Sequence, residues 1–323
     1  MAALIALSYI NDFESRLFFR QKARLCWWSL KNKYCLNQTK KDVLSHYDRG
    51  NDFYKLWMDK GLNYSCAYFK KPVDTLEKAQ LQKIHHTLNK LRLKPGHRLL
   101  DIGCDWRSLL IEAVKKFNVS AVGITLSEEQ YRLGNKRLRQ ADVRHAARIL
   151  LQDYRELAEG GEQFDRIVSI GMFEHVGKEN IVVFFQKARK LLKPGGVILL
   201  HTICRMIPQE LDPWIGTYIF PGGYIPATGE IAEAGEETGY LFLDAKDLRP
   251  HYDLTLGHWL RRFETNVQTI MEMMGEQFVR MWRVYLTGSQ MAFRYGPLHV
   301  IQYLFAQGRR DDWPLTREWL FKS

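Results

Sequence analysis

The sequence predicts an α/β protein with a doubly wound, mostly parallel sheet that is covered by helices on both faces. Between residues 98 and 202, short apolar segments of strand length alternate with longer segments that have the periodicity of amphipathic helices. The strand segments show no alternation of polar and apolar residues, which is typical of parallel strands buried on both faces. An Asp-x-Gly turn, from Asp101 to Gly103, follows the first strand, at the edge where such sheets bind nucleotide cofactors.

The elements of this sheet can be assigned in order along the chain. Asp74 or Thr75 caps a helix that extends from Leu76 to about Leu91 and that stops before Pro95. Right-handed crossovers then connect the parallel strands of the repeat that follows. That repeat has strands at Arg98–Ile102, Ser120–Thr125, Ala147–Leu151, Asp165–Ile170 and Val197–Thr202, and helices near Leu109–Phe117, Glu128–Gln140 and Ile181–Leu192.

After His201 the repeat is interrupted by roughly 45 residues, which is too long for an idle connection. We expect a helical, substrate-covering insertion at about residues 205–260. Strands at Leu241–Leu243 and His299–Phe305, with a helical stretch from about Leu256 to Met291 between them, complete the sheet, and the C-terminal strand is expected to be antiparallel. We therefore divide the chain into an N-terminal segment, 1–60, and a catalytic domain, 61–323.

The N-terminal segment is basic, aromatic and helix-like, and we expect a lid or a membrane-facing helix there. Its apolar residues are interleaved with arginines and lysines, and Trp27 and Trp28 follow them. A basic amphipathic helix of this kind packs on a core or lies in a membrane interface, and both interpretations stay open. Nowhere does a run of about 18 apolar residues occur, so no membrane span is predicted. A signal peptide is not expected, because the first residues lack a basic start and a cleavage site.

The composition limits the class of partner and the compartment. The formal net charge of +11 suits a protein that contacts polyanions. An anionic membrane surface is the expected partner, because no recognised nucleic-acid motif accompanies the charge. The five cysteines are widely spaced without a C-x-x-C pair, which indicates neither a disulfide framework nor a metal site. Reduced thiols in a cytoplasmic protein are the simplest interpretation.

Polar residues at the carboxyl ends of the first three strands form a candidate cofactor site. Gly103 allows a close approach of the backbone to a ligand, and Thr125 can reach a ribose hydroxyl. Asp153 and Tyr154 offer a polar contact and an aromatic face for adenine. A dinucleotide site would require G-x-G-x-x-G, which is absent. The motif favours S-adenosylmethionine, while another nucleotide fold or a structural turn stays open.

The same turn departs from the pattern that it otherwise follows. Turns that cradle S-adenosylmethionine usually read Asp-x-Gly-x-Gly-x-Gly, whereas Asp105 and Arg107 stand at the second and third glycine positions. The carboxylates of Asp101 and Asp105 would repel a pyrophosphate but attract a sulfonium cation. Large side chains at glycine positions can also cause strain of about 1–3 kcal/mol each. A relative with impaired cofactor binding therefore stays open as an alternative.

Several longer segments resemble the cyclopropane-fatty-acyl-phospholipid synthases. They are His46–Tyr54, Tyr64–Phe69, Gly123–Gln130, Phe164–Gly177, Leu200–Ile203, Ile219–Gly223 and Phe278–Phe293, and the resemblance covers about residues 45–310. It implies a class I S-adenosylmethionine-dependent methyltransferase fold. It also implies methyl transfer to the cis double bond of an unsaturated phospholipid acyl chain, after which loss of a proton closes a cyclopropane ring.

The resemblance also implies the residues of the site. A bicarbonate ion serves as the base in this family, and its ligands match Cys66, Glu174, His201, Tyr285 and the main chain of Ile203. Glu174 can accept the hydroxyl hydrogen of the ion, while His201 and Tyr285 can donate to its oxygens. The cofactor contacts match Tyr64, Ser65, Asp101, Gly103, Thr125, Leu126, Gln130, Asp153 and Tyr154. Taken singly, the ion ligands also fit structural roles: a small buried thiol, a carboxylate at a helix start, a core histidine and a packing tyrosine.

The expected enzyme acts on the inner face of the cytoplasmic membrane as a peripheral protein, and a homodimer is possible. Two alternatives stay open besides ring formation. One is a fatty acyl methyltransferase that leaves a methyl or methylene branch. The other is a catalytically impaired lipid-binding relative, in which Asp105 and Arg107 obstruct the cofactor.

Overall fold

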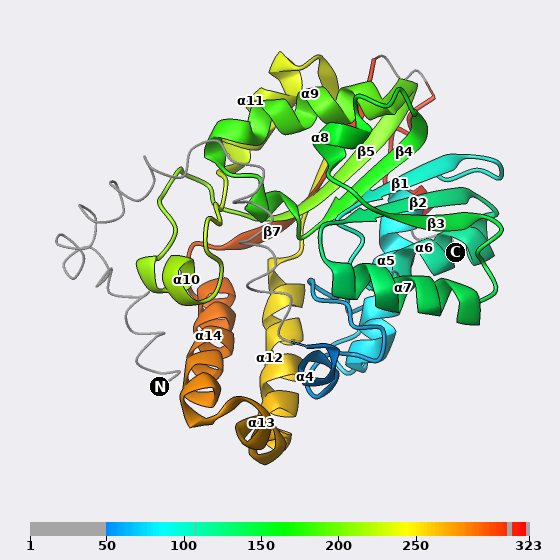
Figure 1. The fold of residues 1–323 in the computed structure, drawn as a ribbon. Helices are drawn as coiled ribbons and strands as arrows, with labels where there is room; N and C mark the ends of the chain where they lie inside the picture. Colours follow the sequence, from blue (N-terminus) through cyan, green and yellow to red (C-terminus); the bar gives the residue numbers. More distant parts are fainter. Residues whose placement is uncertain (1–49, 107, 309–311, 321–323) are drawn as a thin grey trace.

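The computed structural model describes residues 50–106, 108–308 and 312–320, and within them a seven-stranded sheet forms the centre of the fold (Figure 1). The strand order is β3-β2-β1-β4-β5-β7-β6. The first five strands are parallel, whereas β7 is antiparallel to both of its neighbours. This is the predicted fold class. The strands are β1 (Arg98–Ile102), β2 (Ser120–Thr125), β3 (Ala147–Leu151), β4 (Phe164–Ile170), β5 (Leu192–Cys204), β6 (Tyr240–Asp247) and β7 (His299–Gln307).

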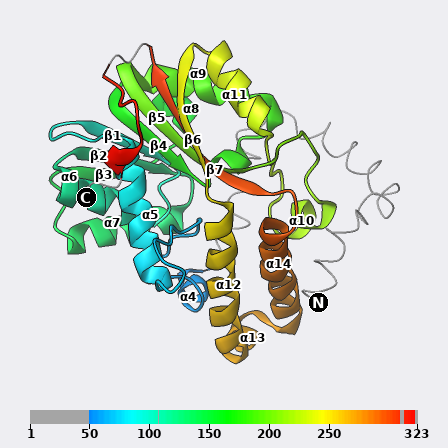
Figure 2. The ribbon, with the colours of Figure 1, turned by 180° about the vertical axis from the view of Figure 1, so that it is seen from behind.

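Helices cover both faces of the sheet (Figures 1 and 2). Leu99 of β1 packs in a cluster with residues of α5 and α6, whereas Leu100 packs in a cluster with residues of α8, α9 and α11. Successive side chains of a strand point to opposite faces, which explains why an uninterrupted apolar run suits a central strand. The helices are α5 (Leu76–Lys90), α6 (Ser108–Phe117), α7 (Glu128–Gln140), α8 (Tyr154–Leu157), α9 (Ile181–Leu191) and α11 (Thr228–Glu237), with short 3₁₀ turns η2 (Phe173–His175), η3 (Lys178–Asn180) and η4 (Glu318–Leu320).

Most predicted boundaries of the repeat lie within one residue of those observed. Thr75 caps α5, because its hydroxyl accepts a hydrogen bond from the amide of Lys78 at 3.3 Å. The main difference is β5, which begins at Leu192 and ends at Cys204, whereas the prediction was Val197–Thr202. Lys193 to Gly196 look like a loop in the sequence, but the strand continues through them.

Three further helices lie beyond one end of the sheet (Figure 1). They are α12 (Arg249–Thr265), α13 (Val267–Met274) and α14 (Glu276–Arg294). A single stretch from about Leu256 to Met291 was predicted, so the prediction missed both the earlier start and the two breaks. Gly275 has a φ of 86°, which a glycine adopts at little cost, and it separates α13 from α14.

The region expected to be one insertion, at about 205–260, is divided by the structure. It contains α10 (Pro213–Tyr218), but α11 packs beside α9 and β6 forms the edge of the sheet beside β7. The predicted strand Leu241–Leu243 is therefore part of a longer strand. Of the predicted range, a cover role remains a prediction for residues 205–227 and for the part of α12 up to about residue 260.

Only a part of the predicted N-terminal segment can be compared, because residues 1–49 lie outside the described residues. The short helix α4 (Asn51–Lys55) packs with the group α12 to α14 rather than apart from it. The ring of Phe53 lies 5.1 Å from that of Trp282, in an edge-to-face arrangement. Within the ranges that the structure describes, we find no helix with the length and apolar character needed to cross a membrane.

Candidate active site

A cleft opens at the carboxyl ends of the parallel strands. Six of the nine residues predicted to contact the cofactor line it, namely Gly103, Thr125, Leu126, Gln130, Asp153 and Tyr154. The lining also contains Ile102, Asp105, Ile124, Gln152, Arg155, Gly171, Met172, His175 and Val176. The topology explains the grouping, because β1, β2, β3 and β4 end at this edge on either side of the point where the strand order reverses.

Asp105 keeps the backbone conformation that a glycine would favour. Its φ is 40°, in the left-handed region that aspartate tolerates better than most residues. The hydroxyl of Thr125 donates to Gln130 Oε1 at 2.7 Å, and Gln130 Nε2 donates to Asp105 Oδ1 at 3.4 Å. The turn therefore has its glycine-like course with a carboxylate added to the cleft wall. Arg107, the second departure from the pattern, lies outside the described residues.

Gly103 is needed at its position for two independent reasons. Its φ is 82°, and a Cβ at this residue would lie 2.7 Å from the Cβ of Met172. That contact is backbone-proximal, so rotation of a side-chain end cannot relieve it. Met172 follows β4 and lines the same cleft. The ends of β1 and β4 therefore lie close together where the chain borders the cleft.

Asp153 is already engaged within the protein. Its carboxylate accepts from the Nε and the terminal nitrogen of Arg155, both at 2.8 Å, and from the Arg155 amide at 2.8 Å. The ion pair is bidentate and mostly buried, and it closes the start of α8. The neighbouring ring of Tyr154 packs edge-on against Phe184. The sequence analysis did not single out Arg155. An arginine two positions after an aspartate that caps a helix is nevertheless a signal that could have found this ion pair.

The other three predicted cofactor residues do not line the cleft. Tyr64 adjoins it, since its carbonyl oxygen lies 4.0 Å from the place of a Cβ on Gly171. The Ser65 hydroxyl accepts a hydrogen bond from Lys83 Nζ at 3.0 Å, and the Lys83 side chain is buried. Asp101 is buried in β1 and lies within the electrostatic reach of the same lysine. Burial lowers the pKa of Lys83, and the nearby carboxylates oppose that shift.

A second group of predicted residues lies where β4 and β5 end. Ile170 of β4 pairs with His201 of β5, and Glu174 of η2 turns back over the strand end. The amide of Ile203 donates to Glu174 Oε1 at 2.7 Å, so this main-chain group is occupied by a protein carboxylate. Within the described part of the chain, Glu174 Oε2 and His201 Nε2 are buried without a hydrogen-bond partner. A pair of such atoms requires an explanation, because unpaired buried polar atoms are costly.

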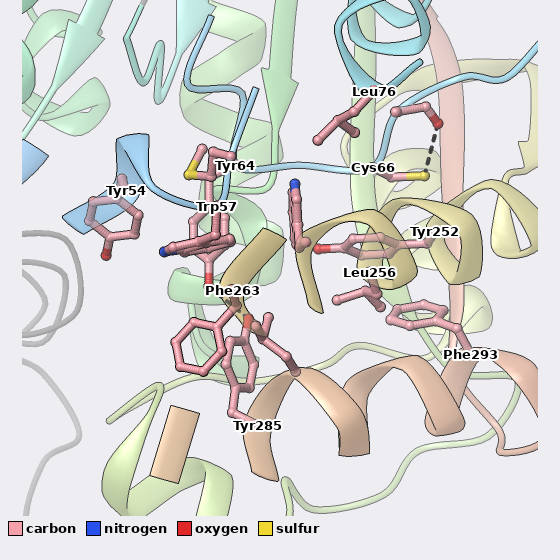
Figure 3. Close-up of a cluster of buried hydrophobic side chains, with 14 of the residues drawn as sticks. Tyr54, Trp57, Tyr64, Cys66, Leu76, Tyr252, Leu256, Phe263, Tyr285 and Phe293 are labelled. Carbon is pink, nitrogen blue, oxygen red and sulfur yellow. Dashed lines mark hydrogen bonds between the residues drawn. The ribbon is translucent and has the colours of Figure 1, made fainter. Parts of the chain in front are cut away.

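Cys66, Tyr64 and Tyr285 belong to one apolar cluster between the sheet and the helices α12 and α14 (Figure 3). The hydroxyls of Tyr64 and Tyr285 share a hydrogen bond of 2.7 Å. The thiol of Cys66 donates to the carbonyl oxygen of Ala67 at 3.2 Å. Tyr252 of α12 joins this group, and the sequence reasoning missed it because one tyrosine on a helix carries no local signal.

The charge states of this group follow from burial. Burial raises the pKa of the Cys66 thiol, which stays protonated and is no nucleophile. Burial also raises the pKa of Tyr252 well above its ordinary value, and the nearby Tyr285, Cys66 and Glu174 raise it further. For Glu174 burial again raises the pKa, whereas the Ile203 amide, the amide of Glu174 itself and the Thr202 hydroxyl lower it. These residues are thus shielded from water, and Glu174 is a carboxylate whose charged form is costly there.

His201 is held neutral by its surroundings. Its side chain is buried on the face of β5 that meets α5, and burial lowers its pKa to about 3, with Lys83, Lys90 and His86 adding to the shift. His86 is itself buried, and its pKa is also lowered to about 3 by burial and by Lys90. Both imidazoles are therefore neutral at physiological pH.

These two histidines predict a loss of stability in acid. A folded-state pKa below the ordinary value of about 6.5 gives stability that is complete above that value and is lost as the pH falls toward 3. At about pH 5 each histidine costs about 2 kcal/mol. His86→Phe keeps the stacking on Tyr68, whose ring lies 4.4 Å away, but removes one titration. We expect a shallower slope of unfolding free energy against pH, by up to about 1.4 kcal/mol per pH unit.

Denaturant titrations between about pH 5 and 7 would measure this slope. The matched control is His145→Phe, the same change at an exposed histidine. Equal slopes for wild type and His86→Phe would contradict the assignment of a neutral, buried imidazole.

Comparison with known proteins identifies the family. The sequence model for a family described as mycolic acid cyclopropane synthetase matches residues 35–303. The chain is 42% identical over 273 residues to the cyclopropane-fatty-acyl-phospholipid synthase of Escherichia coli K12, covering 84% of this chain and 69% of that protein. It is 37% identical over 286 residues to a probable fatty acid methyltransferase of Pseudomonas putida, covering 86% of this chain and 72% of that protein.

Solved structures agree with these sequence matches. The cyclopropane synthase MmaA2 from Mycobacterium tuberculosis superposes with a TM-score of 0.79 at 37% identity, over 83% of this chain and 98% of the other. The mycolic acid cyclopropane synthase CmaA1, solved in complex with SAH and CTAB, gives a TM-score of 0.78 at 36% identity over the same shares. A coclaurine N-methyltransferase at 21% identity and a TM-score of 0.76 shares the fold alone.

Proposed function

The chain belongs to the mycolic acid cyclopropane synthetase family, and from that premise we propose that it is an S-adenosylmethionine-dependent synthase of cyclopropane rings in phospholipid acyl chains. The observation that carries the proposal is that Glu174 Oε2 and His201 Nε2, near the ends of β4 and β5, are both buried without a hydrogen-bond partner in the described residues. An acceptor and a nitrogen that can donate, both shielded from water, suit the binding of a small hydrogen-bonding ion.

The cofactor cleft has the features needed for the methyl donor. Gly103 lets the end of β1 lie against Met172 in the lining of the cleft, and Thr125 with Gln130 presents hydroxyl and amide groups at the end of β2. The carboxylate of Asp105 adds negative charge to the wall, which favours a sulfonium cation. S-adenosylmethionine, when bound there, supplies the methyl group.

We propose that Glu174 and His201 hold a bicarbonate ion, which would supply the base for the proton lost at ring closure. Tyr285, Cys66 and the Ile203 amide already have partners within the protein, in Tyr64, Ala67 and Glu174. Their predicted role as direct ligands would require these bonds to exchange. A negative site beside a carbon that gains positive charge also lowers the barrier. The aromatic residues of the cluster keep water away from that carbon.

Methyl transfer is tested with the purified full chain, labelled S-adenosylmethionine and vesicles of a cis-unsaturated phospholipid. Label in the lipid fraction is expected, and vesicles of a saturated phospholipid are the control. A second protein, Asp105→Gly/Arg107→Gly, addresses the impaired alternative. No label with the wild-type chain, together with label after the double change, would identify a cofactor turn that these side chains obstruct.

A methyl or methylene branch is the second candidate product. The relative from Pseudomonas putida is named a probable fatty acid methyltransferase, and that name fits a product without a ring. Both products begin with the same methyl transfer, which leaves a carbocation. Loss of a proton from the added methyl closes the ring, whereas a hydride shift before that loss leaves a methylene branch, and a saturated methyl branch would also need a hydride-donating reductant. A branched product would carry new methyl or vinylic protons in its proton NMR spectrum.

We further propose peripheral binding to the anionic inner face of the cytoplasmic membrane. Three large apolar side chains in one segment, Met206, Ile207 and Tyr218, are more than half exposed. The segment includes α10, which lies beside α14 in both ribbon views (Figures 1 and 2). The basic charge of the chain would add about 1 kcal/mol for each lysine or arginine near the surface. A homodimer stays a prediction.

Activity on anionic vesicles is therefore expected to fall as the ionic strength rises, because salt screens the attraction between exposed charges. Rates on vesicles with and without anionic lipid, measured over a salt series, test this. Rates that depend on neither salt nor lipid charge would contradict electrostatic attachment, and Ile207→Asp would then test the apolar contact alone.

A further inference from the structure

Gln302 of β7 contacts the inner nitrogen of His201. The two residues are direct partners in the antiparallel pair of β5 and β7, so their side chains share one face of the sheet. Gln302 Nε2 lies 3.3 Å from His201 Nδ1 and donates to the Thr87 hydroxyl at 3.1 Å. All three side chains are buried, with exposed fractions of 1% or less. The sequence reasoning included neither Gln302 nor Thr87.

The contact determines which ring nitrogen carries the proton. A neutral imidazole has one N–H donor and one acceptor, and the amide nitrogen of a glutamine can only donate. With the amide nitrogen of Gln302 turned toward the ring, and Gln302 Oε1 left without a partner in the described residues, Nδ1 of His201 is the acceptor and the hydrogen is on Nε2. Nε2 is the atom that lacks a partner within the described chain. The unpartnered atom of the buried ring is thus a donor.

The Thr87 hydroxyl accepts the hydrogen bond of the same amide nitrogen. Thr87 belongs to α5, where Lys83, His86, Thr87 and Lys90 form one buried stripe at helical spacing, facing β5 and β7. The charged and titratable groups of this stripe, Lys83, His86 and Lys90, all disfavour a positive ring at His201. The stripe thus keeps the ring neutral, and the amide selects its tautomer.

We propose that Gln302 is a positioning residue that holds His201 as the Nε2–H tautomer, so that His201 donates a hydrogen bond to an anionic oxygen in the active site. The inference rests on the proposed function for the identity of that oxygen. The tautomer itself does not depend on it. In the opposite tautomer the same nitrogen would present a lone pair and repel an anion.

The direct test is nitrogen NMR of the full chain with ¹⁵N-labelled histidine, in which the two ring nitrogens of a neutral histidine give separate signals. His201→Asn assigns the signal. We expect a protonated Nε2 in the wild type, and loss of that single tautomer in Gln302→Met, which is neutral and of similar length. We also expect Gln302→Met to lower kcat about 10-fold or more, as for other partners that orient a functional histidine, with unchanged binding of S-adenosylmethionine.

Gln302→Glu provides an opposite perturbation, since its carboxylate accepts from Nδ1–H and favours the other tautomer or the imidazolium. It should shift the pH profile of kcat, whereas the same change at the far end of β7, Gln307→Glu, should not. The inference is overturned if the wild-type ring is protonated on Nδ1, or if Gln302→Met keeps both tautomer and kcat. If the tautomer is as stated but no lipid is methylated by the wild type, the proposed function fails and the positioning contact stands.

Discussion

Gly103→Ala is expected to abolish binding of S-adenosylmethionine and to lower the free energy of unfolding by more than about 1–3 kcal/mol, the usual cost of a strained backbone alone. Its φ of 82° is unfavourable for alanine, and the added Cβ would lie 2.7 Å from the Cβ of Met172. Either β1 and β4 separate at their ends or the turn changes course, and both outcomes alter the floor of the cleft. Calorimetric titration with S-adenosylmethionine and denaturant unfolding measure the two effects.

The chain offers a matched control in Gly96, which lies just before β1. Its φ is 83°, nearly the same as that of Gly103, but no atom lies within 4 Å of the place of its Cβ. Gly96→Ala therefore has the backbone strain without the collision. It should cost about 1 kcal/mol and retain cofactor binding. Normal binding by Gly103→Ala would show that the cofactor does not occupy this cleft.

Glu174→Gln is expected to lower activity by about 100-fold or more while raising stability. Gln can still accept from the Ile203 amide, which now bonds to Glu174 Oε1 at 2.7 Å, but it removes the negative charge at Oε2. Because burial raises the pKa of Glu174, the folded protein favours the protonated form, and a charged Glu174 opposes folding at neutral pH. A neutral side chain of the same shape relieves that cost. Methyl-transfer rates measure the loss of activity, and melting temperatures at about pH 7 and pH 5 measure the change in stability. The gain in stability should be smaller at the lower pH, where the wild-type carboxyl is itself protonated more often.

The control is Glu230→Gln in α11, a partly buried carboxylate with a structural role. Its oxygens accept from the Tyr224 hydroxyl at 2.8 Å and from the Ala227 amide at 2.8 Å. We expect lower stability and unchanged activity, the reverse of Glu174→Gln. If Glu174→Gln instead loses stability and keeps its activity, Glu174 is a structural cap and has no part in the reaction.

Much of the fold follows from the sequence because its strongest signals are local. Strands β1, β2 and β3 were predicted at their observed bounds, since each is an apolar run between polar turns. The three helices from α12 onward were predicted as one, because Asn266 lies within a continuous amphipathic pattern. Only packing shows that the chain turns there. The bulge between Phe242 and Asp244 likewise has no signature in the sequence.

The residues of the candidate site were chosen from the sequence, and their role stays a prediction, whereas their contacts come only from the structure. Glu174, His201 and Ile203 were chosen by resemblance, yet the hydrogen bond that joins Glu174 to Ile203 depends on how η2 turns over β5. Gln302 is about 100 residues from His201 in sequence, and only the pairing of β5 with β7 brings them together. For Asp105 the sequence shows that a glycine of the usual pattern is replaced. It does not show that the backbone of Asp105 keeps a positive φ, of 40°.

The most direct test of the account is the proton NMR spectrum of the lipid recovered after the wild-type chain acts on cis-unsaturated phospholipid vesicles with S-adenosylmethionine. We predict loss of alkene protons and the appearance of upfield protons of a cyclopropane ring. Glu174→Gln should leave the alkene signals almost unchanged. An unchanged spectrum with the wild-type chain, or methyl or vinylic branch signals without ring protons, would contradict the assignment of this chain as a cyclopropane synthase.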